Sequence, residues 1–252
     1  MPLPDLVAIH DTYLTFSRMA RERFSGTVGG RLLLQSEFDA RGAAVVAAVG
    51  IAGAASLSID ADAAVLRQAL RTGLCDFVVT HLDESLRILK NELRRRLPVS
   101  VCLSADPQRA MPEMIERGFQ PDIVSADRGS RDLASDRNPS GNALQTFAAR
   151  GAVFLPINPA PETGTSVLSW KVAADAARTI PQIAAIAADA LDPARDDTPA
   201  RLHWLKIAPR HLGRSFGSRQ CLRMTDNEAA VFAERMHAAI QGVSLIRDGN
   251  LA

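Results

Sequence analysis

Polar side chains stand just beyond the ends of several apolar, strand-like segments of this sequence. Asp60 follows one such segment, where its carboxylate is placed either to accept hydrogen bonds from ribose hydroxyls or to cap the next turn and helix. The other residues with this placement are Ser104, Asp106, Ser125, Asp127 and Arg128. Open α/β sheets bind ligands beyond the carboxyl ends of their strands. These side chains are therefore the predicted small-molecule site.

Residues 31–60 would position the first part of this site. They predict a strand, a junction, an Ala/Val/Gly-rich helix and a second strand that ends in Asp60, which is the layout of a dinucleotide-binding βαβ unit. The junction lacks the glycines of that fingerprint, because it contains Glu37 and Asp39 and only Gly42 at its end. Two carboxylates repel a phosphate. The stretch therefore predicts the fold more specifically than the ligand.

Two residues of the junction, Asp39 and Arg41, are open to two interpretations. They either replace phosphate recognition with another kind of contact at the edge of the sheet, or belong to a solvated loop.

Short apolar segments alternate with helical patterns over the first two thirds of the chain. Strands are expected at 31–36, 55–60, 75–80, 99–103, 121–126 and 152–156. Helices are expected at 5–24, from the end of the junction at Gly42 up to Gly53, and at 62–71, 83–96, 107–117 and 142–150. This alternation predicts a Rossmann-like, doubly wound α/β fold with a mostly parallel six-stranded sheet and a lead-in helix. Residues 127–142 are expected to form an exposed loop.

The last hundred residues have a different pattern, which predicts a helical C-terminal extension. We expect a long helical region at 166–191 that kinks or divides at Pro181, a strand or extended arm at 200–207, a mobile or partner-packing arm at 209–223 and a final helix at 225–241. The expected domains are a lead-in helix at 1–30, the Rossmann-like domain at 31–165 and the helical region with its arm at 166–252.

Composition excludes some classes of partner. The 29 basic and 28 acidic residues nearly cancel, so the chain has no net field that would attract nucleic acid or an anionic membrane. No stretch approaches the roughly 20 apolar residues that span a bilayer, and the N-terminus does not resemble a secretory leader. We therefore expect a cytoplasmic protein that binds neither nucleic acid nor membrane.

The cysteines and histidines do not form a metal or nucleophile pattern. The 3 cysteines, Cys75, Cys102 and Cys221, are far apart, and the 5 histidines show no ligand spacing. Cys102 lies within an expected strand, where burial raises the pKa of a thiol and lowers its reactivity. No metal site and no catalytic residue are predicted.

A set of short segments carries a family resemblance. It includes Asp11-Thr12-Tyr13-Leu14-Thr15-Phe16, Leu82-Asp83-Glu84-Ser85-Leu86, Met111-Pro112-Glu113-Met114-Ile115-Glu116-Arg117-Gly118 and the stretches 29–31, 54–60, 70–73, 98–101 and 121–124. Together they resemble the NAD-binding domain of urocanase (urocanate hydratase) over most of residues 11–132. A shorter similarity, at 199–204, matches the segment by which that family leaves the NAD domain.

The resemblance implies a cofactor site, in which NAD acts as an electrophile toward the urocanate imidazole. The family's glycine-rich turn falls on residues 37–43, where only Gly42 remains, its ribose-binding acid falls on Asp60, and Val65 replaces an arginine. Two further turns are rewritten, at 105–107 and at 127–131. The cofactor-binding residues that the resemblance implies are Gly42, Asp60, Asp106, Asp127, Arg128 and Ser130. The family's catalytic core domain has no counterpart in these residues.

Three functions follow from this combination. The first is a urocanase-like, non-catalytic protein that binds a small ligand, such as a nucleotide, or a protein partner. The second is a lyase-like or NAD-dependent enzyme completed by another chain or by a second copy across a homodimer. The third is an assembly role, in which the lead-in helix and the Ala-rich region form a homodimer or hetero-oligomer interface. NAD is expected as a cofactor only on the basis of the family resemblance.

Overall fold

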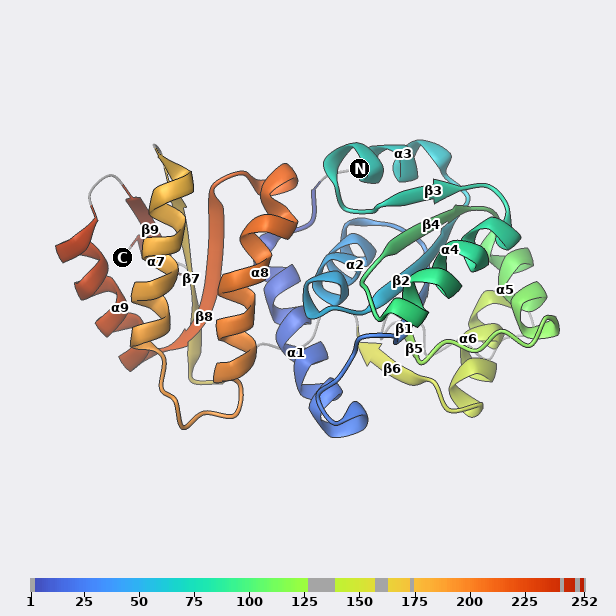
Figure 1. Cartoon of the computed structure of the whole chain (residues 1–252), viewed down its shortest axis with the longest axis horizontal. Coiled ribbons are helices and arrows are strands. Elements are labelled where there is room, and N and C mark those ends of the chain that lie inside the picture. Colours follow the sequence, from blue (N-terminus) through green and yellow to red (C-terminus); the bar gives the residue numbers. More distant parts are fainter. Residues whose placement is uncertain are drawn as a thin grey trace. The chain divides into compact units, whose positions relative to one another are not determined.

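The computed structural model describes residues 3–126, 139–156, 163–172, 175–240, 243–247 and 250–251. The chain divides into two compact units, Met1–Pro159 and Ala160–Ala252, here called unit 1 and unit 2. Their elements are labelled in Figure 1.

Unit 1 contains a six-stranded sheet in the order β3-β4-β2-β1-β5-β6, and all of its strand pairs are parallel. Its strands are β1 (Leu32–Ser36), β2 (Ala55–Asp60), β3 (Phe77–Val79), β4 (Ser100–Ser104), β5 (Ile123–Ala126) and β6 (Val153–Pro156). Its helices are α1 (Leu6–Phe24), α2 (Ala40–Ala52), α3 (Ala63–Thr72), α4 (Leu82–Arg95), α5 (Pro107–Glu116) and α6 (Pro139–Ala149). The predicted Rossmann-like α/β fold, the sheet and the lead-in helix are confirmed.

Helices cover both faces of this sheet (Figure 1), which explains why its central strands are apolar without interruption. Successive side chains of a strand point to opposite faces. Leu33 packs in one core with α1 and α2, whereas Leu32 and Leu34 pack in the other with α4, α5 and α6. The run of three leucines is therefore buried on both sides.

Unit 2 contains a four-stranded antiparallel sheet in the order β10-β9-β7-β8. Its strands are β7 (Thr165–Val172), β8 (Arg219–Thr225), β9 (Val243–Arg247) and β10 (Asn250–Leu251), and its helices are α7 (Ala176–Ala190), α8 (Thr198–Phe216) and α9 (Asp226–Ala239). Trp170 of β7 and Phe232 of α9 are buried, with ring centroids 5.4 Å apart. The core of this unit lies between its sheet and its helices.

Several predictions for the last hundred residues are wrong. The region 166–191 begins with β7 rather than a helix, because Leu168, Trp170 and Val172 bury alternate positions against β8 and the helices. The helix that follows, α7, continues through Pro181 instead of dividing there. The final helix is confirmed as α9, whose N-cap Thr225 forms a capping box with Glu228.

The strand or extended arm expected at 200–207 is wrong, because these residues lie in helix α8. The segment 209–223, expected as a mobile or partner-packing arm, contains the end of α8 and most of strand β8. Buried residues of α8 recur at three- and four-residue spacing, at Arg201, Trp204, Leu205, Ala208 and Leu212. The buried arginine in this series hid the helical period. Within the described ranges, no helix is both long enough and apolar enough to cross a bilayer.

Candidate functional site

The carboxyl edge of the unit 1 sheet has a topological switch point between β1 and β5. The helix after β1, α2, packs on one face of the sheet, and the helix after β5, α6, packs on the other. In such sheets the crevice between these two strand ends is the usual ligand site. The register places Ser104 directly beside Asp60 and Ser125 directly beside Gln35. Two of the predicted residues thus lie next to each other at this edge, and a third lies across the switch point.

Asp127, Arg128 and Ser130, which were predicted for the same site, lie outside the described residues. Their place in the site stays a prediction.

The β1–α2 turn is closed by hydrogen bonds within the chain. Glu37 has the left-handed conformation, with φ of 68°, and its N–H donates to the Ile59 carbonyl over 2.9 Å. The N–H of Phe38, whose side chain is fully buried, donates to the Asp60 carboxylate over 2.7 Å. Two backbone donors of this turn are therefore already bound to acceptors of β2.

Asp60 is the residue that organises this turn. One carboxylate oxygen accepts from Phe38 N and the other accepts from Asp62 N, each over 2.7 Å. A carboxylate offers about four lone-pair sites, so two such bonds leave it further accepting capacity. The side chain is half-buried at the strand end. Its turn-forming role is visible in the structure, and its ligand role stays a prediction.

Asp39 and Asp106 begin the helices α2 and α5. Asp39 accepts from Gly42 N over 2.8 Å, and Arg41 Nε lies 3.3 Å from its other oxygen. Asp106 accepts from Gln108 N over 2.9 Å and is exposed. Both are helix caps that satisfy donors of the first turn. At α2 this cap takes one of the backbone donors that phosphates bind at helix N-termini.

Gly42 has a steric role in the same turn. A Cβ atom built on it would lie 2.7 Å from the Glu37 carbonyl oxygen and 3.0 Å from Gln35 Nε2. Real Cβ atoms essentially never approach backbone oxygen so closely, so only glycine fits. Closure of the turn therefore explains why this position requires glycine, and no ligand is needed for that explanation.

A buried polar group beneath the turn was missed by the sequence analysis. Gln35 Nε2 donates to the Gly42 carbonyl and to Ser58 Oγ, each over 3.1 Å. Gln35 and Ser125 are 0% and 1% exposed, and within the described part of the chain Gln35 Oε1 and Ser125 Oγ have no hydrogen-bond partner. Buried polar atoms of this kind usually bind water or a ligand group. The available signal was glutamine at the end of an otherwise apolar strand.

Cys102 of β4 lies in the same cross-strand row as Gln35, because both residues are in register with Ser58 of β2. Its hydrogen bond with Cys75, together with burial, raises the pKa of the Cys102 thiol well above its ordinary range. A thiol in that state is a poor nucleophile. No group of His, Cys, Asp and Glu within the described ranges is arranged to hold a metal ion.

Residues 8–150 match the family model of the urocanase Rossmann-like domain. This chain belongs to the urocanase family. The match covers most of unit 1 and ends before unit 2 begins. The segment 199–204, for which the sequence predicts a further similarity, lies outside the matched residues, and most of it belongs to α8.

The cofactor that urocanase-family membership implies is NAD, and the β1–α2 turn does not fit its pyrophosphate. The donors of Glu37, Phe38 and Gly42 are bound to the chain's own oxygens. Glu37 and Asp39 add two exposed carboxylates to this turn, one of them paired with Arg41. An added phosphate would therefore meet negative charge where the family's glycines would offer free N–H groups.

Proposed function

We propose that this chain, taken by itself, is a non-catalytic binding protein of the urocanase family. Its ligand is a small, hydroxyl-bearing molecule without phosphate charge, such as a nucleoside, and it binds at the carboxyl edge of the unit 1 sheet. The observation that carries the proposal is the β1–α2 turn, where the N–H groups of Glu37, Phe38 and Gly42 are bound to the chain's own carbonyl and carboxylate oxygens.

Two features of the edge support a neutral ligand. Asp60 has accepting capacity beyond its bonds to Phe38 and Asp62, which suits the hydroxyls of a ribose. A nucleoside would keep this contact and would avoid the repulsion that Glu37 and Asp39 exert on phosphate.

The absence of catalysis is proposed from the same edge. Asp39, Asp60 and Asp106 accept bonds from backbone N–H groups, and the pKa of the Cys102 thiol, which lies in register with Ser58, is raised. Asp60, Asp39 and Asp106 hold turns and helix ends there. Such side chains position a ligand but do not supply an activated nucleophile.

Calorimetric titration of the full chain with adenosine, AMP and NAD tests this proposal. We expect affinity to fall in that order as phosphate charge is added. Asp60→Asn should weaken adenosine binding at least about tenfold, equivalent to about 1.4 kcal/mol. Asp62→Asn is the matched control, because it removes a neighbouring charge while asparagine still caps α3.

Three results would contradict the proposal. Tighter binding of NAD than of adenosine would mean that the turn accepts a pyrophosphate after all. Equal adenosine affinity in the wild type and in Asp60→Asn would remove Asp60 from the site. Turnover of urocanate by the chain alone would contradict the non-catalytic part.

A further inference from the structure

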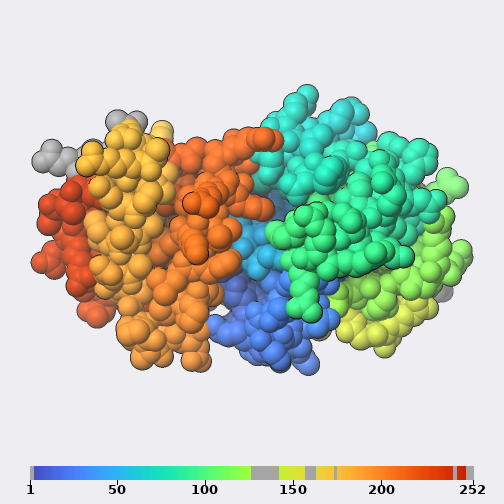
Figure 2. Space-filling model, in the orientation of Figure 1, coloured from blue at the N-terminus to red at the C-terminus, as the bar shows by residue number. Residues whose placement is uncertain are grey.

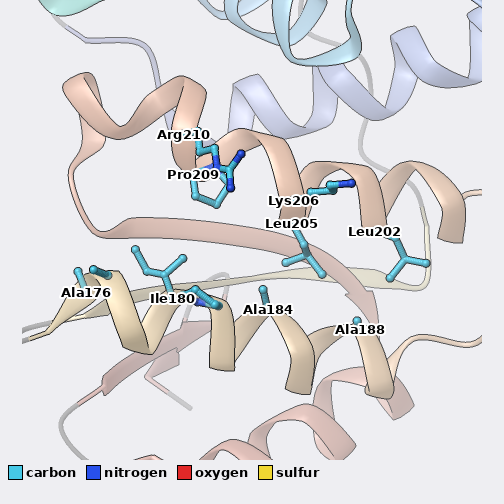
Figure 3. Close-up of a pocket in the computed structure, with 11 residues that line it drawn as sticks. Ala176, Ile180, Ala184, Ala188, Leu202, Leu205, Lys206, Pro209 and Arg210 are labelled. Atoms are coloured by element: carbon cyan, nitrogen blue, oxygen red, sulfur yellow. The ribbon is translucent and has the colours of Figure 1, made fainter.

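Helices α7 and α8 of unit 2 run antiparallel and leave a groove of about 600 Å³ between them (Figure 3). Both helices lie at the surface of the unit in the space-filling view (Figure 2). Ala184 of α7 and Leu205 of α8 point toward each other across the groove. Its lining is mainly apolar, so the groove suits an apolar occupant.

The α7 side of the groove is lined by small and medium side chains at four-residue spacing. Ala176, Ile180, Ala184 and Ala188 recur every four residues and all line it. At 1.5 Å per residue this row is about 18 Å long. Alanines in such a row let another backbone approach closely. The row therefore has the length and shape for an additional helix.

The α8 side adds exposed apolar surface and positive charge. Leu202 is 41% exposed, although it lines the groove. Lys206 and Arg210 also line it and are exposed, and α8 contains no acidic residue. In the described part of the chain neither cation forms an ion pair. Arg201 of the same helix, in contrast, is paired with Asp197 and Glu228.

We propose that this groove docks an amphipathic, acidic helix of a protein partner. Apolar residues of that helix at i, i+4 and i+7 would lie between α7 and α8, as in other helix-in-groove complexes. Carboxylates along one flank of it would face Lys206 and Arg210. Lys206 and Arg210 would favour a partner helix with negative charge. The apolar row at four-residue spacing would favour a helical segment over an extended one.

The openness of the groove favours a helix over a small amphiphile. Ala177 and Pro181 line it and are exposed, as is Leu202. Small-molecule pockets enclose most of their ligand. A groove that is open along two helices instead leaves one face of its occupant in solvent, which is the arrangement of a docked amphipathic helix.

Fluorescence anisotropy with the full chain and synthetic helical peptides tests the proposal. Peptides of about 16 residues are long enough, at 1.5 Å per residue, to span the groove. All peptides carry the same leucine face. One series has glutamate on the flank, and the matched series has lysine. We expect the glutamate series to bind at least about tenfold more tightly, and added salt to reduce the difference.

Variants of the chain locate the binding. Lys206→Glu combined with Arg210→Glu should reverse the preference, so that the lysine series binds more tightly. Leu202→Glu should weaken both series, because it places a charge on the apolar lining. Arg178→Glu is the matched control, since Arg178 is an exposed cation of α7 that does not line the groove.

Three outcomes would overturn the proposal. The first is equal affinity for the two peptide series. The second is a preference that Lys206→Glu with Arg210→Glu does not change. The third is binding of a fatty acid such as dodecanoate, lost in Leu202→Glu, without binding of either peptide series, which would assign the groove to a small amphiphile.

Discussion

Asp60 of unit 1 and Glu228 of unit 2 both tie loop backbone to a strand or helix, but they do so in different electrostatic surroundings. Asp60 binds two backbone N–H groups and has no ion pair within the described residues. Glu228 binds the N–H groups of Asp192 and Thr225 over 2.8 Å each, and also the Arg201 guanidinium over 2.7 Å.

The difference separates the proposed binding residue Asp60 from a buried structural connection at Glu228. Glu228 and Arg201 are 2% and 1% exposed, so their ion pair lies inside the fold. Asp60 is half-buried, with accepting capacity left at the edge where α/β sheets bind ligands. The comparison therefore predicts that changes at Glu228 and Arg201 affect stability alone, whereas changes at Asp60 also affect ligand binding.

The largest effect is expected from Arg201→Ala, which leaves the Glu228 carboxylate buried without its cation. Breaking a buried ion pair in this way costs about 3–5 kcal/mol. Urea unfolding of the full chain measures the loss. Arg95→Ala is the control, because it removes an arginine from the surface pair with Glu92 and should change little. Equal losses in the two variants would contradict the structural role of Arg201.

Gly42→Ala should have the next largest effect. Its Cβ would meet the Glu37 carbonyl at 2.7 Å, and overpacking of this kind costs about 1–3 kcal/mol. Gly213→Ala is the control, because nothing lies within 4 Å of a Cβ there and alanine should stabilise helix α8 by up to about 1 kcal/mol. If both substitutions stabilise the protein in urea unfolding, the closure of the β1–α2 turn is not what requires glycine.

The pH dependence of stability should report Glu228. Burial alone would raise the pKa of this carboxyl, but hydrogen bonds from Arg201, Asp192 and Thr225 together lower it below the ordinary value of 4.5. A group with a lowered pKa stabilises the fold above its unfolded-state pKa and loses that contribution as the pH falls through its folded-state pKa.

We therefore expect the free energy of unfolding to fall as the pH drops below about 4.5, and to fall less steeply in Glu228→Gln. Urea unfolding at a series of pH values measures both slopes. Identical slopes would mean that other carboxyl groups carry the acid sensitivity.

The smallest effect is expected at Glu37, whose φ of 68° is unfavourable for a residue with a Cβ. Glycine relieves this conformation, and Glu37→Gly should stabilise unit 1 by about 1 kcal/mol. Glu37→Gln removes the same charge but keeps the Cβ, so it separates backbone strain from electrostatics. A gain of the same size in both variants would assign the effect to charge.

The fold of unit 1 could be predicted because its pattern has few alternatives. Strands buried on both faces are continuously apolar, as at Leu32–Leu34, and helices between them dictate parallel pairing. Unit 2 was harder to predict. Ser166 and Ser169 interrupt the apolar pattern of β7, and an alanine-rich helix follows it, so the strand was included in the helix. Arg201 could not be predicted as buried, because its partner Glu228 is 27 residues away.

The candidate site was predictable only in part. Asp60 and Ser104 could be placed at one edge from the order of strands and helices. The bonds of Asp60 to Phe38 and Asp62, and the buried Gln35 Oε1, depend on side-chain directions within a turn. Periodicity carries no information about those directions.

The affinity of the double variant Glu37→Gly with Asp39→Asn for NAD, compared with the wild type, tests the central claim most directly. Asparagine keeps the cap of α2, and glycine keeps the left-handed turn, so the variant removes charge without removing structure. If these carboxylates exclude the pyrophosphate, calorimetry should show at least a tenfold gain in affinity, about 1.4 kcal/mol. Unchanged affinity in a folded variant would contradict the claim that the rebuilt turn decides the ligand.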